Sequence, residues 1–227
     1  MLSWIVTDFI AKICYFFITF SYTINYTITR GHAMKVKLFL LPVLIFLLVT
    51  TLFSSAGAQE QPPIIIETTM GKMTVQLFDD KAPISCDNIR QYVREGFYDG
   101  LLFHRVIPDF MIQGGGFGPG LSKKDTKAPI INEADNGLKN RRGTLALART
   151  QDINSATSQF FINLKDNTFL DHRSMRMSEY GYAVFGEVVE GMAVVDAIAE
   201  VPRGRRGMHD DVPLDDVVII RMYEEEM

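Results

Sequence analysis

The sequence predicts a mainly β fold, an antiparallel barrel or sandwich with two helices covering its open ends. Three observations predict this fold. After residue 63, short runs of β-branched and aromatic residues follow one another closely, stretches rich in Gly, Asn and Asp separate them, and only two segments show helical periodicity. Many short strands with few helices are typical of barrels and sandwiches.

The predicted domain begins with a β-hairpin and a helix. Ile64 to Thr68 is rich in β-branched residues, Met70-Gly71 suits a turn, and Met73 to Leu77 alternates apolar with polar residues. Pro83 suits the first turn of a helix, and Gly96 suits its end. Apolar residues recur at helical spacing between these two positions, so we expect one amphipathic helix there.

The rest of the domain reads as further strands and a second helix. Strand-like runs are followed or preceded by turn-forming residues, as expected for short antiparallel strands. These strands are expected at 101–107, 110–113, 143–148, 159–164, 183–188 and, closing the domain, 217–222. The second helix is expected at 192–200.

Charge and cysteine content exclude several classes of function. The formal net charge of -4 argues against nucleic-acid binding, and the basic clusters Lys139 to Arg142 and Arg203 to Arg206 are interpreted as solvated loops. Only Cys14 and Cys86 are present, and Cys14 lies in a segment that the mature protein should lack. No internal disulfide is therefore expected, and Cys86 has no nearby His or second Cys that would suggest a metal site or a redox motif. Cys86 is expected to be a packed or half-buried helix residue.

Residues 34–58 have the features of a secretory signal peptide. Lys35 and Lys37 follow Met34, an apolar run extends from Leu38 to Phe53, and Ala56-Gly57-Ala58 provides small residues for cleavage. The apolar run is shorter than the about 20 residues that a membrane-spanning helix needs. We expect cleavage after Ala58, a periplasmic protein and a linker at 59–63. The alternative is a protein that the uncleaved segment anchors to the inner membrane. This segment is the only part of the chain that we expect to contact a membrane.

Residues 1–33 precede this signal and do not fit it. They are aromatic and apolar from Ile10 to Phe20 and rich in Thr and Tyr up to Arg30, whereas a signal peptide begins near its own methionine. We interpret residues 1–33 as an extension that results from a start codon assigned too far upstream. The alternative is a second membrane segment.

Two motifs carry a resemblance to a known family. The run from Phe103 to Gly115, FHRVIPDFMIQGG, resembles the central signature of the cyclophilins, and Ser158 to Ile162, SQFFI, resembles their second signature. The order and spacing of Phe169-Leu170-Asp171, Val184-Phe185-Gly186 and Glu190-Gly191-Met192 agree as well. The resemblance extends from Pro62 to Met222, and details such as Ala148-Arg149-Thr150 are similar to the bacterial periplasmic members.

This resemblance implies a fold and an activity. The fold would be a closed eight-stranded antiparallel β-barrel capped by two helices, formed by residues 64–227. The activity would be peptidyl-prolyl cis-trans isomerisation of proline-containing, unfolded or partly folded polypeptides, by a monomer without a cofactor.

The resemblance also implies the site. Arg105 would be catalytic, and Gln113 would hold the peptide backbone. An apolar pocket for the proline ring would be lined by Phe110, Met111, Phe161 and Leu170. Further substrate contacts are expected from Ala148, Arg149, Gln159, Phe169 and Tyr182. Many eukaryotic members have Trp and His where this chain has Phe169 and Tyr182, and Asn where it has Arg149, so the roles of Arg149 and Tyr182 stay open.

Strand geometry supports part of this assignment. In a strand, alternate residues share a face, so Met111 lies beside Gln113 and Gln159 beside Phe161, while Phe160 points into the core. His104 is expected to be a hydrogen-bonded neighbour of the site rather than a base or a ligand.

Two other functions remain open. One is a binding or chaperone module of the cell envelope whose isomerase activity is incidental. The other is a structural envelope protein tethered by residues 1–53.

Overall fold

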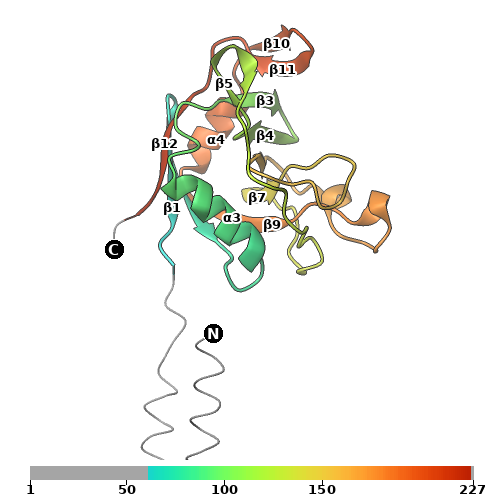
Figure 1. Cartoon of the computed structure of the whole chain (residues 1–227). Coiled ribbons are helices and arrows are strands. Elements are labelled where there is room, and N and C mark those ends of the chain that lie inside the picture. The colour runs from blue at the N-terminus through green and yellow to red at the C-terminus, as the bar shows by residue number, and fades with distance from the viewer. Residues whose placement is uncertain (1–60, 226–227) are drawn as a thin grey trace, which may run out of the picture. The chain divides into compact units, whose positions relative to one another are not determined.

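An eight-stranded, curled antiparallel sheet forms the body of the domain (Figure 1). The computed structural model describes residues 61–225, so the predicted extension, the signal peptide and the start of the linker lie outside the described residues. The strands follow the order β12 (Ile219–Glu224), β1 (Ile64–Thr68), β2 (Gly71–Leu77), β9 (Val184–Glu190), β7 (Thr144–Leu147), β8 (Phe160–Asn163), β4 (Met111–Gly114) and β3 (Phe103–Ile107). Each predicted strand is found, with its ends shifted by a few residues.

The two end strands, β12 and β3, meet only at their beginnings. Leu102 forms an isolated β-bridge with Val218. The amide of Phe103 donates to the carbonyl of Val217 over 2.9 Å, and the amide of Ile219 donates to the carbonyl of Leu101 over 2.7 Å. Past this point the hairpin strand β11 (His209–Pro213) packs against β3. The expected closed barrel is therefore not confirmed, because within residues 61–225 the sheet is curled but its end strands share no continuous ladder.

The two predicted helices, α3 (Pro83–Arg94) and α4 (Met192–Ala199), are present. Helix α3 has no capping side chain of its own, but the Glu133 carboxylate accepts hydrogen bonds from the backbone of Ile84 and Ser85, at 3.0 and 2.7 Å. This carboxylate satisfies amides that a helix start leaves unpaired and has the sign that a helix N-terminus favours.

The described cysteine, Cys86, is buried in α3, as expected from the sequence. Burial, joined by the nearby Asp79 carboxylate, raises the pKa of its thiol to about 12. The thiol is therefore protonated at neutral pH and unsuited to nucleophilic chemistry.

The central strands β7 and β8 are buried on both faces. Phe160 and Ile162 point inward to the main core, together with side chains from both helices. Phe161, the residue between them, points outward into a second apolar cluster. The predicted alternation of Phe160 and Phe161 is confirmed, and the second cluster places apolar surface on the outside of the sheet.

Within the described residues, two short hairpins and several 3-10 turns lie outside the eight-stranded sheet. A short hairpin joins β5 (Phe117–Gly118) to β6 (Ser122–Lys123) through a 3-10 turn at Pro119–Leu121, and further 3-10 turns lie at Thr168–Leu170 and Met177–Glu179. The interpretation of Arg203 to Arg206 as a loop is wrong, because these residues form β10 (Arg203–Arg206), which pairs with β11. Buried Val212 ties this hairpin to the domain. No helix within residues 61–225 is long and apolar enough to span a membrane.

Candidate active site

A row of paired residues crosses the outer face of the sheet. The register aligns Arg105 of β3 with Gln113 of β4, Gln113 with Phe161 of β8, Phe161 with Ala146 of β7, and Ala146 with Val184 of β9. Side chains of directly paired residues lie on one face, with Cβ atoms about 4.5 to 5.5 Å apart. The row therefore places a guanidinium and an amide at the edge of an apolar surface.

The apolar part of this surface is the second cluster of the fold. Its buried members are Met111, Ala146, Phe161, Leu170 and Val184, and its partly buried members are Phe78, Ile107, Phe110, Leu138, Ala148 and Tyr182. All four predicted pocket residues and two further predicted contacts, Ala148 and Tyr182, thus lie together. The sequence prediction missed Ala146 and Val184. Alternation could have revealed Ala146, because it lies two residues before Ala148 within the strand expected at 143–148.

A β-bulge in β3 positions Arg105. Phe103 is paired with Gly114 and Arg105 with Gln113, so two steps along β3 match one step along β4. An extra residue of this kind shifts the alternation of side chains. Phe103 and Val106 consequently share the main core, which leaves Arg105 on the outer face. The ion pairs among residues 61–225 do not include Arg105.

Two glutamines meet beside Arg105. The side-chain amide of Gln113 donates a hydrogen bond to Oε1 of Gln159 over 2.9 Å. The stem of Gln159 lies on the backbone of Gly116, where an added Cβ would be only 2.5 Å from two of its carbon atoms. The absent side chain at position 116 leaves room for Gln159 to reach Gln113.

Two aromatic rings and a polar network form one side of the surface. Phe169 is 59% exposed and stacks on Phe110, with ring centroids 5.6 Å apart. The side-chain amide of buried Asn167 donates to the carbonyl of Phe110 and to Oδ1 of Asn163, both over 2.8 Å. Phe169 and Leu170 lie on the 3-10 turn that begins after Asn167. The hydrogen bond from Asn167 to the Phe110 carbonyl therefore attaches the start of this turn to the backbone of Phe110.

Comparison with known proteins identifies the family. The model of the family described as cyclophilin type peptidyl-prolyl cis-trans isomerase/CLD matches residues 64–224. The chain belongs to this family of enzymes. Cyclophilins of this type act on proline-containing polypeptides, and the match includes every predicted site residue.

Curated bacterial cyclophilins are similar over nearly their full length. Peptidyl-prolyl cis-trans isomerase B of Escherichia coli is 57% identical over 156 residues, which are 69% of this chain and 95% of that protein. Peptidyl-prolyl cis-trans isomerase A of Dickeya dadantii is 48% identical over 181 residues, 79% of this chain and 94% of that protein.

A solved cyclophilin supports the fold. The Cryptosporidium parvum cyclophilin, crystallised in the presence of the dipeptide Ala-Pro, aligns with a TM-score of 0.63 and 25% identity. The alignment covers 73% of this chain and 99% of that one.

Arg149 and Tyr182, whose roles the cyclophilin resemblance left open, contact each other. The guanidinium of Arg149 lies 4.7 Å from the centre of the Tyr182 ring, and its Nε and Nη1 donate to the carbonyls of Gly181 and Thr150, at 3.0 and 2.9 Å. Tyr182 in turn meets Phe161 edge to face, with centroids 5.7 Å apart. Arg149 thus fixes an aromatic wall of the cluster, and a cation over a ring face is stabilising.

His104, next to Arg105 in the chain, is buried with no hydrogen-bond partner for Nδ1 among the described residues. Its ring packs against Phe117, with centroids 4.6 Å apart. Burial, reinforced by His209 and Arg105 and opposed by a hydrogen bond to the backbone of Leu102, lowers the pKa of His104 to about 4. The imidazole is therefore neutral at physiological pH and does not add a second cation to the site.

We predict that His104 makes the domain sensitive to mild acid. Its folded pKa lies below the ordinary value of about 6.5, so the unfolded chain binds more protons between these values and stability falls as pH drops through 6.5 towards 4. Linkage gives a loss of about 2 kcal/mol between pH 7 and pH 5. Urea unfolding of the parent and of His104→Gln at both pH values measures it. Equal losses in the two proteins would show that other groups cause the acid sensitivity.

We also predict that Gly116→Ala weakens substrate binding. Gly116 has no positive φ, so alanine brings no backbone strain, but its Cβ would displace Gln159 from Gln113. Loss of one oriented hydrogen bond should raise KM about five- to tenfold. Gly118→Ala is the matched control, because an added Cβ there comes no closer than 3.3 Å, to Ser122 Oγ. In a Gln159→Ala background the Gly116→Ala penalty should disappear, and a persistent penalty would place its cause elsewhere.

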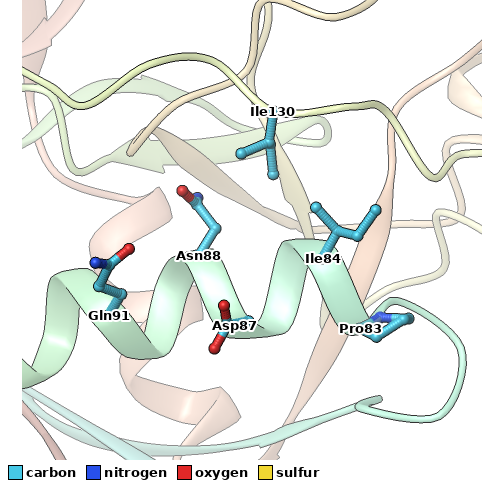
Figure 2. A pocket seen from close by; sticks show the side chains of 6 residues that line it. All are labelled: Pro83, Ile84, Asp87, Asn88, Gln91 and Ile130. Atoms are coloured by element: carbon cyan, nitrogen blue, oxygen red, sulfur yellow. The ribbon is translucent and has the colours of Figure 1, made fainter. Parts of the chain in front are cut away.

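A shallow depression of about 330 Å³ lies beside α3, and none of its lining residues belongs to this cluster. Figure 2 shows Ile84 and Ile130 pointing towards each other above the helix, with Asn88 and Gln91 further along it. None of its lining residues is a predicted site residue. Within residues 61–225, no three His, Cys, Asp or Glu side chains are grouped so that they could hold a metal ion.

Proposed function

We propose that this protein accelerates the rotation of X-Pro bonds in exported polypeptides during their folding, with Arg105 as the catalytic group. The observation that carries the proposal is the row in which Arg105 and Gln113 border the outer apolar cluster. A polar edge beside an apolar surface suits a proline ring and the peptide backbone on either side of it.

The reaction needs no covalent chemistry. Rotation about a peptide bond removes amide resonance and meets a barrier of about 18 to 20 kcal/mol, so an X-Pro bond takes roughly tens to hundreds of seconds to exchange. The twisted amide has a lone pair on the prolyl nitrogen that the planar amide lacks. A catalyst must bind this twisted state more tightly than the planar one.

Arg105 supplies the group that makes this distinction. Its guanidinium donates a hydrogen bond to the prolyl nitrogen in the twisted state, where the lone pair is available, and stabilises it selectively. Arginine stays protonated and offers its donors in a rigid fork, which a lysine ammonium does not reproduce. Reaching about 10³ s⁻¹ from about 10⁻² s⁻¹ requires about 7 kcal/mol, so one hydrogen bond must be supplemented by positioning and water exclusion.

The remaining site residues provide that positioning. Phe110, Met111, Phe161 and Leu170 receive the proline ring, because they form contiguous apolar surface in the cluster. Gln113, held by Gln159, binds the peptide backbone. Phe169, Ala148 and the Tyr182 ring under Arg149 extend the contact to neighbouring substrate residues.

A prolyl isomerisation assay tests the proposal. The purified protein should accelerate cis/trans exchange of short X-Pro peptides without added metal or nucleotide. A folded sample without activity would contradict it and would favour the alternative, a cyclophilin-like binding or chaperone module of the cell envelope.

The proposed place of action is the periplasm. Export with cleavage after Ala58 is supported by three features: the basic residues Lys35 and Lys37 behind Met34, the apolar run, and the small residues at 56–58. An uncleaved segment would instead anchor the protein to the inner membrane.

We predict that the exported protein begins at Gln59. Ala56-Gly57-Ala58 is the small-residue site directly behind the apolar run, so a signal peptidase should cut after Ala58. Intact-mass measurement of periplasmic material checks this, with the membrane fraction as the control. A protein that starts at Met1 or Met34 and is found in the membrane fraction would contradict periplasmic release and support the anchored alternative.

A further inference from the structure

The segment between Leu170 and Tyr182 has an exposed apolar tip. Met175 and Met177 are 72% and 62% exposed, and Phe169, just before Leu170, is 59% exposed. Of the ten large hydrophobic side chains exposed in residues 61–225, these three lie within nine consecutive residues. Leu170 and Tyr182, which flank the segment, belong to the apolar cluster of the site, so the loop begins and ends at the edge of the proposed pocket.

The base of this loop, residues 171–181, is fixed by backbone contacts. The amide of Tyr182 donates to the carbonyl of Leu170 over 3.0 Å, which joins the two ends. Gly181 has a φ of 83°, and a Cβ there would be 2.7 Å from the Leu170 carbonyl oxygen, so only glycine allows this close approach.

Hydrogen bonds also hold the upper part of the loop. The amide of Arg173 donates to the carbonyl of Glu179 over 2.9 Å, and the hydroxyl of Ser174 donates to the Glu179 carboxylate over 2.6 Å. Figure 1 shows this orange segment, between β8 and β9, standing out from the sheet. The two methionines are therefore presented to solvent on a held loop.

Methionine suits a partner without a fixed shape. Its unbranched, polarisable side chain adapts to many apolar surfaces, and methionine-rich surfaces are typical of promiscuous binders. An unfolded polypeptide presents apolar side chains of varied size near its prolines. Such a chain can reach beyond the pocket, because an extended segment gains about 3.3 Å per residue, whereas a tetrapeptide ends close to the proline.

We propose that loop 171–181 is a docking surface for the apolar side chains of unfolded polypeptides whose X-Pro bonds enter the pocket. This inference rests on the proposed isomerase function and specifies its substrate class. Docking through Met175 and Met177 raises the local concentration of prolyl bonds at Arg105 and therefore lowers KM without changing the bond rotation itself.

Two substrates, one double variant and one control double variant test this inference. The substrates are an X-Pro tetrapeptide and a denatured protein whose refolding is limited by one non-native prolyl bond. For Met175→Ser/Met177→Ser, we expect kcat/KM on the tetrapeptide to stay within about twofold of the parent value. Its kcat/KM on the protein substrate should fall about tenfold, as expected for two lost apolar contacts. Met70→Ser/Ile220→Ser removes exposed apolar side chains from the β1–β2 turn and from β12, and should change neither value.

A competitor gives a second measurement. A permanently unfolded, proline-free polypeptide rich in apolar residues should inhibit the parent protein on the protein substrate but not the Met175→Ser/Met177→Ser variant. Unchanged activity of that variant on the protein substrate, or equal losses on both substrates, would overturn the inference. A parent protein inactive on the tetrapeptide would instead contradict the proposed function.

Discussion

Replacing Arg105 with alanine is expected to lower kcat at least about a hundredfold, on the order of 3 kcal/mol of transition-state stabilisation. The reason is that the proposed hydrogen bond forms only with the twisted amide, so its loss should leave KM nearly unchanged. Arg105 makes no ion pair among residues 61–225, and truncating it should therefore leave the unfolding temperature close to that of the parent.

Two controls accompany this measurement. Arg105→Lys keeps the charge but not the planar fork, and should recover little of the lost rate. Arg221→Ala removes an exposed arginine that binds Glu67 on the β12–β1 side of the sheet, and should leave activity unchanged. If activity and thermal stability fell together in Arg105→Ala, Arg105 would be a structural residue.

The sequence was sufficient to predict which segments form the main strands and helices, because their signals are local. Alternation placed Phe160 and Phe161 on opposite faces, and the two clusters confirm this. Pro83 marked the start of α3 correctly. The helix ends at Arg94, two residues before Gly96, which has the positive φ of 62° that glycine favours after a helix.

The β-bulge in β3 could not be predicted from local pattern. Strict alternation would put Phe103 and Arg105 on the same face. The structure instead buries Phe103 in the main core, and pairing with Gly114 on another strand decides this. The bulge forms because it buries the Phe103 side chain, which would otherwise be exposed to water at a cost in free energy. Whether that side chain can be buried depends on tertiary contacts, which a local sequence pattern does not show.

The hairpin β10–β11 and the Arg149 contacts were missed for similar reasons. Arg203 to Arg206 lacks apolar residues, and buried Val212 on the partner strand is what holds the hairpin to the domain. Arg149 follows β7, outside regular strand geometry, so no periodicity indicates where its side chain lies. Its partners, the Tyr182 ring and the Gly181 carbonyl, are distant in sequence.

Replacing Arg90 with methionine is expected to destabilise the domain by about 3 kcal/mol, because it removes one partner of a buried ion-pair network. The Arg90 side chain is 4% exposed. Its Nε and Nη2 donate to both carboxylate oxygens of Asp79, at 3.2 and 3.0 Å, and its Nη1 donates to Glu224 and to the carbonyl of Pro62, at 3.1 and 2.9 Å. This arginine therefore joins α3 to both ends of the domain.

The two carboxylates determine the size of this loss. Burial opposes the charge of Arg90, but the hydrogen bonds that Arg90 donates to Asp79 and Glu224 outweigh it, so the pKa of the guanidinium is raised. Methionine fills similar space but leaves Asp79 without its cation and the Pro62 carbonyl without its donor. Asp79 and Glu224 are 33% and 22% exposed, which lets water replace part of the interaction and keeps the loss near the lower end for buried pairs.

Arg94→Met is the matched control for this variant. Arg94 binds the same Glu224 carboxylate, at 2.8 Å, but its side chain is 55% exposed, so its loss should cost less than about 1 kcal/mol. Urea unfolding of the parent and of the two variants at pH 7 gives the three free energies. Equal losses would mean that burial of Arg90 does not matter. A loss confined to Arg90→Met, with kcat unchanged in the fraction that stays folded, would show that this network stabilises the domain without contributing to catalysis.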